Sequence, residues 1–281
     1  MELCFGTKKI DCSRRTLIMG ILNVTPDSFS DGGKFFSPQA AAEHGRRMID
    51  EGADIIDIGG ESTRPKGAYG EGAQTVSADE ELRRILPVVK ELRKAGDCLL
   101  SIDTYKAEVA EQAILEGADI INDISGLSLD PKMAAVVARH NAALVVMHMQ
   151  GTPATMQSDP HYEDVVNEVK QELSARAATA RAAGIGTVIV DPGFGFGKNY
   201  RHNLLLLKHL GSLKEIGCPI LVGTSRKGFI GTATDTEIGD RLDGTSATVA
   251  IAIMNGAAIV RVHDVRQMKR VAMMTDAVLH A

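Results

Sequence analysis

Three segments of the chain repeat one another and indicate how its helices and strands are joined. In each segment a glycine ends a helix-like stretch, a short turn follows, and an apolar run begins. The segments are Glu51–Ile58 (EGADIIDI), Glu116–Ile124 (EGADIINDI) and Asn255–Val262 (NGAAIVRV). Asp57, Asn122 and Arg261 interrupt the far ends of the three apolar runs. Since a strand buried on both faces has no structural need for such residues, we expect the ends of these strands to share one site.

The chain contains eight apolar runs of strand length, separated by helical patterns. The runs are Thr16–Val24, Ala53–Gly60, Cys98–Thr104, Ala118–Ser125, Ala142–Met149, Thr187–Pro192, Cys218–Thr224 and Ala257–Asp264. Continuous apolar runs of this length are typical of strands covered on both faces. Strands that alternate with helices form parallel sheets with right-handed crossovers. Eight such units predict an α/β fold, a (β/α)8 TIM barrel, with an open doubly wound sheet as the alternative.

Residues that favour helix starts lie between these runs. Ser37 precedes a proline, and Ser77 opens a capping box. Asp130 and Asp159 each precede a proline and repeat the pattern of a cap followed by proline. The opening residues Leu3–Arg15 predict a short hairpin that closes the floor of the barrel.

Length, charge and cysteine use narrow the class of protein. The 281 residues suffice for a barrel, which takes about 250, so we expect one domain over residues 1–281. The net charge is −5 and the Lys and Arg residues are dispersed, which argues against nucleic acid or a membrane surface as a partner. Neither a membrane-spanning run nor the apolar core of a signal peptide is present. The scattered cysteines predict reduced thiols in a cytoplasmic protein.

Two long glycine-rich segments follow the first two expected strands. They are Thr25–Phe36 and Glu61–Thr75. Long loops in a compact fold are commonly either lids or disordered insertions. Because a barrel carries its site at the carboxyl ends of its strands, we expect these loops to be lids.

Polar residues at the expected strand ends form two chemical groups. The first group is Asp103, Asn122 and Asp191. Their oxygens can accept hydrogen bonds from a flat, NH-rich heterocycle and stabilise positive charge that develops on it. The second group is Arg64, Arg226, Lys227, Arg261 and His263. Cations and backbone N–H groups directly after buried strands suit a diphosphate, and Asn23 with a bound Mg²⁺ would complete that site.

Several other motifs are absent or weak. Gly193, Gly195 and Gly197 lack the GxGxxG spacing of a dinucleotide site. The chain contains neither the GxxxxGK[ST] phosphate-binding loop nor the HExxH zinc motif. His148, in the segment MHMQ, is expected to be a packing or supporting residue rather than a metal ligand.

A set of ordered segments, each at an expected strand end, identifies a family. The segments are GILNVTPDSFSDGG (Gly20–Gly33), GGESTRP (Gly59–Pro65), SIDT (Ser101–Thr104), INDISG (Ile121–Gly126), MHMQGTP (Met147–Pro153), DPGFGFGK (Asp191–Lys198), GTSRKGFIG (Gly223–Gly231) and RVHD (Arg261–Asp264). Together they resemble the dihydropteroate synthases, the pterin-binding TIM-barrel enzymes of folate synthesis. The resemblance runs from about Thr16 to His263, which is nearly the whole chain.

The resemblance implies a transferase with two small-molecule substrates and Mg²⁺ as its cofactor. It would condense 6-hydroxymethyl-7,8-dihydropterin diphosphate with p-aminobenzoate, giving 7,8-dihydropteroate and diphosphate. The pterin would be bound by Asp103, Asn122, Asp191 and Lys227, with Met147 against its ring. The diphosphate would be bound by Thr63, Arg64, Arg261 and His263, with Asn23 on Mg²⁺.

The resemblance also implies where the second substrate binds. Phe29 and Pro65 from the two lids would form the p-aminobenzoate slot with Ser225 and Lys227. Asp31 would approach the reacting centre from the first lid. The expected catalytic residues are then Asp103, Asp191, Lys227 and Asp31. A homodimer formed through the outer helices is a further expectation from the resemblance.

Two features depart from the family pattern. The second lid, Lys66–Thr75, is several residues longer than is usual, which bears on sulfonamide inhibitors that mimic p-aminobenzoate. Gly228 stands where the family often has Ser, so one hydroxyl contact to the benzoate carboxylate is missing.

Two other functions share part of this pattern. One is a pterin-binding barrel that passes a methyl group from a tetrahydrofolate to a corrinoid protein. That reaction has no use for a diphosphate site, so Lys227, Arg261 and His263 argue against it. The other is a pterin-binding protein without turnover, against which the complete set of cations and both lids argue.

Overall fold

Parallel strands form the centre of the molecule, which is described here from a computed structural model covering all residues except 1, 7, 26–36, 63–75 and 153–154. Within the described residues, eight parallel strands are hydrogen-bonded in the order β8-β7-β6-β5-β4-β3-β10-β9. Their bounds are β3 Leu17–Asn23, β4 Ile55–Gly59, β5 Leu99–Asp103, β6 Ile120–Asp123, β7 Ala143–Met147, β8 Val188–Asp191, β9 Leu221–Val222 and β10 Ile259–Val262. Each strand lies within one of the eight predicted runs.

The two edges of this sheet meet and close the barrel. Val190 of β8 forms a parallel bridge with Ile220, directly before β9. The Val190 amide also donates to the Pro219 carbonyl oxygen at 3.0 Å. The prediction of a (β/α)8 barrel is therefore confirmed, and the open doubly wound sheet is wrong.

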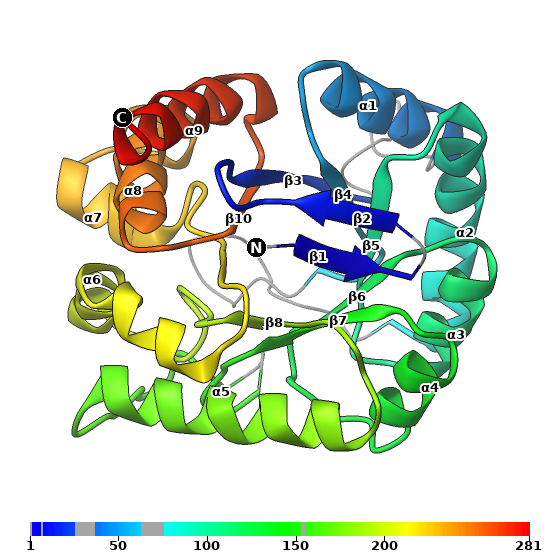
Figure 1. The fold of residues 1–281 in the computed structure, drawn as a ribbon, viewed down its shortest axis with the longest axis horizontal. Coiled ribbons are helices and arrows are strands. Elements are labelled where there is room, and N and C mark those ends of the chain that lie inside the picture. The colour runs from blue at the N-terminus through cyan, green and yellow to red at the C-terminus, as the bar shows by residue number, and fades with distance from the viewer. Residues whose placement is uncertain (1, 7, 26–36, 63–75, 153–154) are drawn as a thin grey trace.

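Helices surround the strands on the outside of the barrel (Figure 1). They are α1 Pro38–Asp50, α2 Ala78–Ala95, α3 Ala107–Leu115, α4 Met133–Arg139, α5 Val165–Ala182, α6 Tyr200–Lys208, α7 Gly228–Thr234, α8 Leu242–Met254 and α9 Val265–Leu279, with 3-10 turns at Leu210–Ile216 and Ile238–Asp240. Ser37 and Ser77 cap α1 and α2 as predicted, since each side chain accepts a hydrogen bond from a backbone amide three residues on.

The start of α5 differs from the sequence prediction. Asp159 and the proline after it lie in the preceding loop, and Asp164 caps the helix instead. Its carboxylate accepts hydrogen bonds from the amides of Val166 and Asn167, which satisfies two of the free donors at the helix start. Asp130 likewise lies ahead of α4, where it accepts from the amides of Lys132 and Ala107.

A hairpin closes the amino-terminal end of the barrel. Strands β1 (Glu2–Phe5) and β2 (Lys8–Asp11) pair antiparallel and lie across the near end of the barrel in Figure 1. Leu3 and Phe5 are buried against the inward-facing apolar side chains of the barrel, including Leu17 and Met19 of β3. The predicted hairpin at the barrel floor is therefore present, and the barrel interior is a packed core at this end.

The helices cover a second and larger apolar core. Alternate residues of each strand face outward, so Ile18 and Leu22 of β3 pack against the helices while Leu17 and Met19 face the interior. Among the described residues, no helix combines the length and apolarity needed to cross a bilayer.

Candidate active site

Inward-facing side chains change from apolar to polar toward the carboxyl ends of the strands. The interior core includes Ile55, Leu99, Ile120, Ile189 and Ile259. Since side chains two residues apart face the same side, the next inward positions are Asp57, Ser101, Asn122, Asp191 and Arg261. The strand pattern that fills the barrel floor thus places a layer of polar groups directly above it.

Asp57 lies at the centre of this polar layer and is fully buried. Its Oδ2 accepts a hydrogen bond from Nε of Arg261 at 2.6 Å and another from Nδ2 of Asn122 at 3.2 Å. A terminal guanidinium nitrogen of Arg261 donates to Oδ2 of Asp103 at 2.8 Å. Of the three residues that interrupt the sequence repeats, Asp57 thus contacts both of the others. Its place in the repeat indicates that it lies at the shared site, but the sequence does not indicate its role there.

Burial changes the acidity of the two predicted carboxylates. Burial raises the pKa of Asp103 to about 7, although the adjacent Arg261 lowers it, and the nearby carboxylate of Asp57 raises it further. Burial also raises the pKa of Asp191, while its hydrogen bond from the Gly193 amide and the charge of Lys227 lower it. The acid from β5 and the acid from β8 therefore face the same cations.

Lys227 reaches this cluster from the turn after β9. Burial, followed by repulsion from Arg261, lowers the pKa of its ammonium group to about 8, while Asp191 and Asp103 raise that pKa. The Nζ atom lies 4.4 Å from the ring centre of Phe196, a favourable cation–π distance. The preceding residue, Arg226, has a left-handed φ of 58° and forms an ion pair with Asp264 that joins this turn to the end of β10.

His263 differs from the cation expected in the basic group. Burial and repulsion from Arg261 lower the pKa of its imidazole to about 3, so the ring is neutral at pH 7. Its Nδ1 lies 3.0 Å from Oγ of Ser225, and that same Oγ accepts the His263 amide at 3.2 Å. The Ser225 hydroxyl can accept the amide and donate to Nδ1 at the same time, and in that arrangement the ring proton lies on Nε2. Ser225 thus contacts His263 directly.

A buried lysine was missed by the sequence reasoning. Lys198 ends the segment DPGFGFGK and is only 3% exposed. Its Nζ donates to Nδ1 of His148 at 2.9 Å, and Nε2 of His148 lies 3.0 Å from Oε2 of Glu172 on α5. Burial lowers the pKa of Lys198 to about 7, whereas Asp191 and Glu172 raise it. His148 is a buried supporting residue in this network, as its place in the sequence predicted.

The residues near the end of β3 offer oxygen ligands that fit Mg²⁺. Asn23 is half-buried at the end of the strand, beside Gly59 of β4. A Cβ atom added to Gly59 would lie 3.9 Å from Oδ1 of Asn23 and 3.9 Å from Oδ2 of Asp103, so these two oxygens flank the same point. Within the described part of the chain no cluster of three His, Cys, Asp or Glu residues suits a metal. This donor set therefore fits Mg²⁺ only together with phosphate oxygens, which Mg²⁺ prefers.

Several residues predicted for the site lie outside the described residues. They are Phe29, Asp31, Thr63, Arg64 and Pro65, all in the two expected lids. The predicted residues that the structure does describe lie at or directly after the ends of seven different strands. They are Asn23, Asp103, Asn122, Met147, Asp191, Ser225, Lys227, Arg261 and His263.

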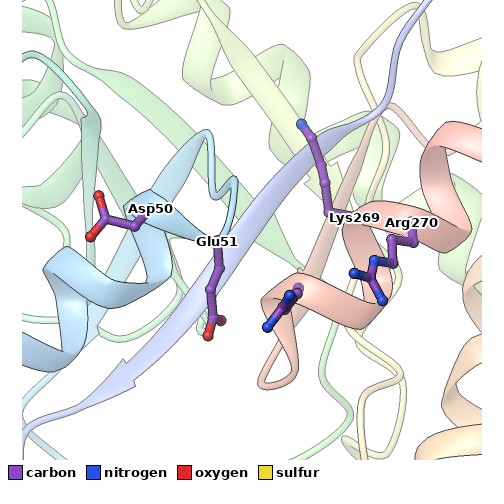
Figure 2. A pocket seen from close by; sticks show the side chains of 5 residues that line it. Asp50, Glu51, Lys269 and Arg270 are labelled. Atoms are coloured by element: carbon purple, nitrogen blue, oxygen red, sulfur yellow. The ribbon is translucent and has the colours of Figure 1, made fainter.

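A hollow on the outer surface differs from this site in both place and chemistry. It is lined by Asp50, Glu51, Arg266, Lys269 and Arg270. Figure 2 shows Asp50 and Glu51 at the end of α1, with the Asp50 carboxylate pointing away from α9, and Lys269 and Arg270 on α9. The end of α1 leads into the amino-terminal end of β4, so the hollow lies away from the carboxyl ends of the strands.

Comparisons with known proteins agree with the barrel fold. A family model described as pterin binding enzyme matches residues 19–263. The dihydropteroate synthase of Synechocystis sp. is 48% identical over 275 residues, which cover 97% of this chain and 93% of that protein. The structure of dihydropteroate synthase from Yersinia pestis with a sulfonamide drug complex is 42% identical, with a TM-score of 0.92 and 100% of both chains covered.

A third comparison concerns an enzyme with a pterin bound. Dihydropteroate synthase from Xanthomonas albilineans, in complex with 7,8-dihydropteroate, is 39% identical over 100% of both chains, with a TM-score of 0.88. Sequence identity this high over the full length, together with the same fold, indicates proteins of one family. The chain therefore belongs to the pterin-binding enzymes and, among them, to the dihydropteroate synthases, the transferases of folate synthesis.

Proposed function

We propose that this barrel condenses 6-hydroxymethyl-7,8-dihydropterin diphosphate with p-aminobenzoate, giving 7,8-dihydropteroate and diphosphate. The observation that carries the proposal is the meeting of Asp103 and Asp191 with Lys227 and Arg261 at the carboxyl end of the barrel. Acids and bases from distant segments meet there, and Arg261 donates directly to Asp103 at 2.8 Å. The product of such a condensation is the ligand named for the Xanthomonas albilineans relative.

The acidic side of the site is suited to the pterin. A pterin ring presents N–H groups along one edge, and Asp103, Asn122 and Asp191 offer oxygen acceptors for them. Lys227 donates to an acceptor of the ring, and buried Met147 lies against its face. Because Asp103 and Asp191 are held in place before the substrate arrives, they also stabilise positive charge that develops on the ring.

The basic side of the site is suited to the diphosphate. Arg261 supplies positive charge, and neutral His263 donates a hydrogen bond from Nε2 toward the anion. Thr63 and Arg64 are the further predicted contacts. Asn23 would supply the protein's ligand to Mg²⁺, which neutralises the charge of the leaving diphosphate when it is bound.

The reaction follows from this division of the site. The bond between the pterin methylene carbon and the diphosphate oxygen breaks, and its electron pair leaves with diphosphate. The methylene cation that remains is conjugated with the ring, where Asp103 and Asp191 stabilise it by about 3–4 kcal/mol each. The amine nitrogen of p-aminobenzoate then attacks the carbon and loses a proton. Phe29, Pro65, Ser225 and Lys227 would orient the amine, and Asp31 would lie beside the reacting carbon.

A coupled assay for diphosphate release tests this proposal. Release should require the pterin diphosphate, p-aminobenzoate and Mg²⁺ together. Asp103→Ala should abolish turnover and keep the fold, whereas Asp97→Ala, at an exposed position, should behave as the wild type. Release without p-aminobenzoate, or near-normal activity of Asp103→Ala, would contradict the proposal. Methyl transfer to a corrinoid and binding without turnover both predict no diphosphate release.

We further propose that two copies pair through the outer face of α8 and α9. Large apolar side chains are exposed on these two adjacent helices: Ile251, Met254, Met273, Met274 and Val278. An exposed apolar surface on a soluble barrel is typical of a protein–protein contact. Light scattering should give the mass of a dimer for the wild type and of a monomer for Met274→Lys. A monomeric wild type would contradict this.

A cytoplasmic location is the remaining proposal. All four cysteines lie in the described part of the chain and are free thiols. Free thiols are typical of a reducing compartment. Fractionation of cells that produce the protein would test it.

A further inference from the structure

The buried Lys198 lies outside the set of residues that the proposed reaction uses. All three hydrogens of its ammonium group have acceptors among the described residues. They are Nδ1 of His148 at 2.9 Å, the carbonyl oxygen of Phe196 at 2.9 Å and the carbonyl oxygen of His148 at 3.3 Å. A buried cation is costly unless it is fully hydrogen-bonded, so these contacts specify the position of Nζ closely.

These acceptors belong to two different parts of the barrel. His148 directly follows β7, whereas Phe196 lies in residues 192–199, which we call the β8 loop. Glycines let the loop backbone press against the end of β7. A Cβ atom on Gly193, where φ is +69°, would lie 1.9 Å from the His148 carbonyl oxygen, and one on Gly197, where φ is +59°, would lie 2.6 Å from the Gln150 carbonyl oxygen. Lys198 joins the two parts through its hydrogen bonds across this contact.

The tie is anchored on the outer layer of the barrel. Because Nδ1 of His148 accepts from the ammonium group, the ring proton lies on Nε2 and points to Oε2 of Glu172 at 3.0 Å. Glu172 also forms an ion pair with Arg176, and Arg176 contacts the carbonyl oxygen of Met147. The end of β7 is therefore fixed from both sides.

The two parts joined by Lys198 carry side chains that lie together beside the proposed pterin site. Met147 ends β7, and Phe196 packs in the same apolar cluster from the β8 loop. The Phe196 ring in turn supports the ammonium group of Lys227 at 4.4 Å. Asp191, the last residue of β8, accepts the Gly193 amide at 2.7 Å. A shift of the β8 loop away from β7 would displace Phe196, remove its ring from the Lys227 ammonium group and break the hydrogen bond from Gly193 to Asp191.

We propose that Lys198 is a positioning residue that ties the β8 loop to the end of β7 and thereby fixes Phe196 relative to Met147 in the proposed pterin site. The inference rests on the proposed function, because it concerns the slot for that substrate. It assigns Lys198 no contact with the substrate. Its effect passes through Phe196, which packs beside Met147 in the pterin part of the site. The binding of the pterin should therefore depend on Lys198 far more than the binding of p-aminobenzoate.

The test compares Lys198→Met with the wild type and with Lys170→Met. Lys170 lies on α5 in an exposed ion pair with Glu215, and it serves as the matched control. Calorimetry with 6-hydroxymethyl-7,8-dihydropterin diphosphate alone gives the dissociation constant of each protein without turnover. We expect Lys198→Met to weaken binding about tenfold or more, as displacements near 1 Å do, with a change of less than about twofold in KM for p-aminobenzoate. Lys170→Met should match the wild type.

A double-mutant cycle separates positioning from general destabilisation. In the Phe196→Leu background, Lys198→Met should cost little further affinity, because the two residues act through one contact. Equal weakening for both substrates, or losses that add in the double variant, would overturn the inference. Lys198→Gln retains two donors and should lose less affinity than Lys198→Met. If Lys198→Met does not fold, the dissociation constant of Lys198→Gln for the pterin diphosphate tests the inference in its place.

Measurements on the wild type distinguish a failure of the proposed function from a failure of the positioning role of Lys198. A wild type that binds the pterin diphosphate and releases diphosphate, with Lys198→Met unchanged, overturns the role of Lys198 alone. A wild type that neither binds the pterin diphosphate nor releases diphosphate overturns the proposed function and the positioning role with it.

Discussion

The guanidinium of Arg261 lies 2.6 Å from the carboxylate of Asp57, although 204 positions of sequence separate the two residues. Arg261 also contacts Asp103, so one cation lies between two carboxylates from neighbouring strands. Asn122 donates to the same oxygen of Asp57. The polar tips of the three sequence repeats thus meet through Asp57, which holds Arg261 in the orientation that reaches Asp103.

Asp57→Asn should therefore lower both stability and activity. The substitution removes one of the two carboxylates that neutralise the half-buried guanidinium, and the loss of one charged hydrogen bond costs about 1–3 kcal/mol. It should also lower the pKa of Asp103, because the charge of Asp57 raises it. Urea denaturation gives the change in unfolding free energy, with the exposed Asp97→Asn as control. A change as small as that of the control would contradict the role assigned to Asp57.

The pH profile of kcat/KM should have two limbs. Asp103 accepts hydrogen bonds as a carboxylate, so activity should fall as the pH drops below its pKa of about 7. Lys227 acts as a cation, so activity should fall as the pH rises above its pKa of about 8. Initial rates at low pterin concentration, from pH 5 to 10, report these values for the free enzyme.

Variants assign the two limbs to their residues. Lys227→Arg keeps its charge throughout and should remove the alkaline limb, whatever activity remains. Asp103→Asn should flatten the acid limb of its residual activity. An acid limb that persists in Asp103→Asn would belong to the diphosphate of the substrate, and a flat wild-type profile from pH 6 to 9 would contradict both assignments.

His263 should act as a neutral donor rather than a cation. Its imidazole has a pKa of about 3, because burial and Arg261 disfavour the charged form. Diphosphate binding measured by calorimetry should then show no step from this residue between pH 5 and 8. His263→Gln, which keeps a neutral N–H donor, should bind diphosphate more tightly than His263→Ala. Equal losses in the two variants would argue that the donor on Nε2 is not used.

The hairpin at the barrel floor should contribute strongly to stability. Phe5 is 1% exposed and packs into the interior core, so Phe5→Ala should lower the unfolding free energy by about 3–5 kcal/mol. Leu129→Ala, at a side chain that is 46% exposed, should change it little. At a temperature where Phe5→Ala is folded, its kcat/KM should match the wild type, since the hairpin lies at the opposite end from the site. A loss of activity without a loss of stability would contradict this.

The fold was predictable because its strongest signals are local. Each barrel strand is covered on both faces, so it appears in the sequence as one continuous apolar run, such as Ala142–Met149. A run of this length favours a buried strand over other structures. Caps such as Ser37 and Ser77 act within a few residues and could be read directly. The start of α5 was misjudged because the proline after Asp159 resembles a helix start, whereas the cap used is Asp164, which has no proline after it.

The contacts within the site were less predictable because they depend on strand register around the ring. The pairing of Arg261 with Asp57 requires the strand order β10-β3-β4 and the depth of each residue in the barrel. The neutral state of His263 follows from its burial beside Arg261, which no sequence pattern records. Lys198 was missed because a lysine in a glycine-rich segment is usually solvent-exposed, and its burial results from the close approach of the loop backbone to β7.

Leu3, Phe5 and the interior core fill the amino-terminal end of the barrel, so the polar layer is approached from the carboxyl ends of the strands. Substrates and product must enter and leave along the barrel axis from that end. A molecule seated deepest must arrive first and depart last, and a second one resting above it blocks the exit. Two substrates stacked in this way would be taken up in a compulsory order, and the joined product would have to back out along the same route.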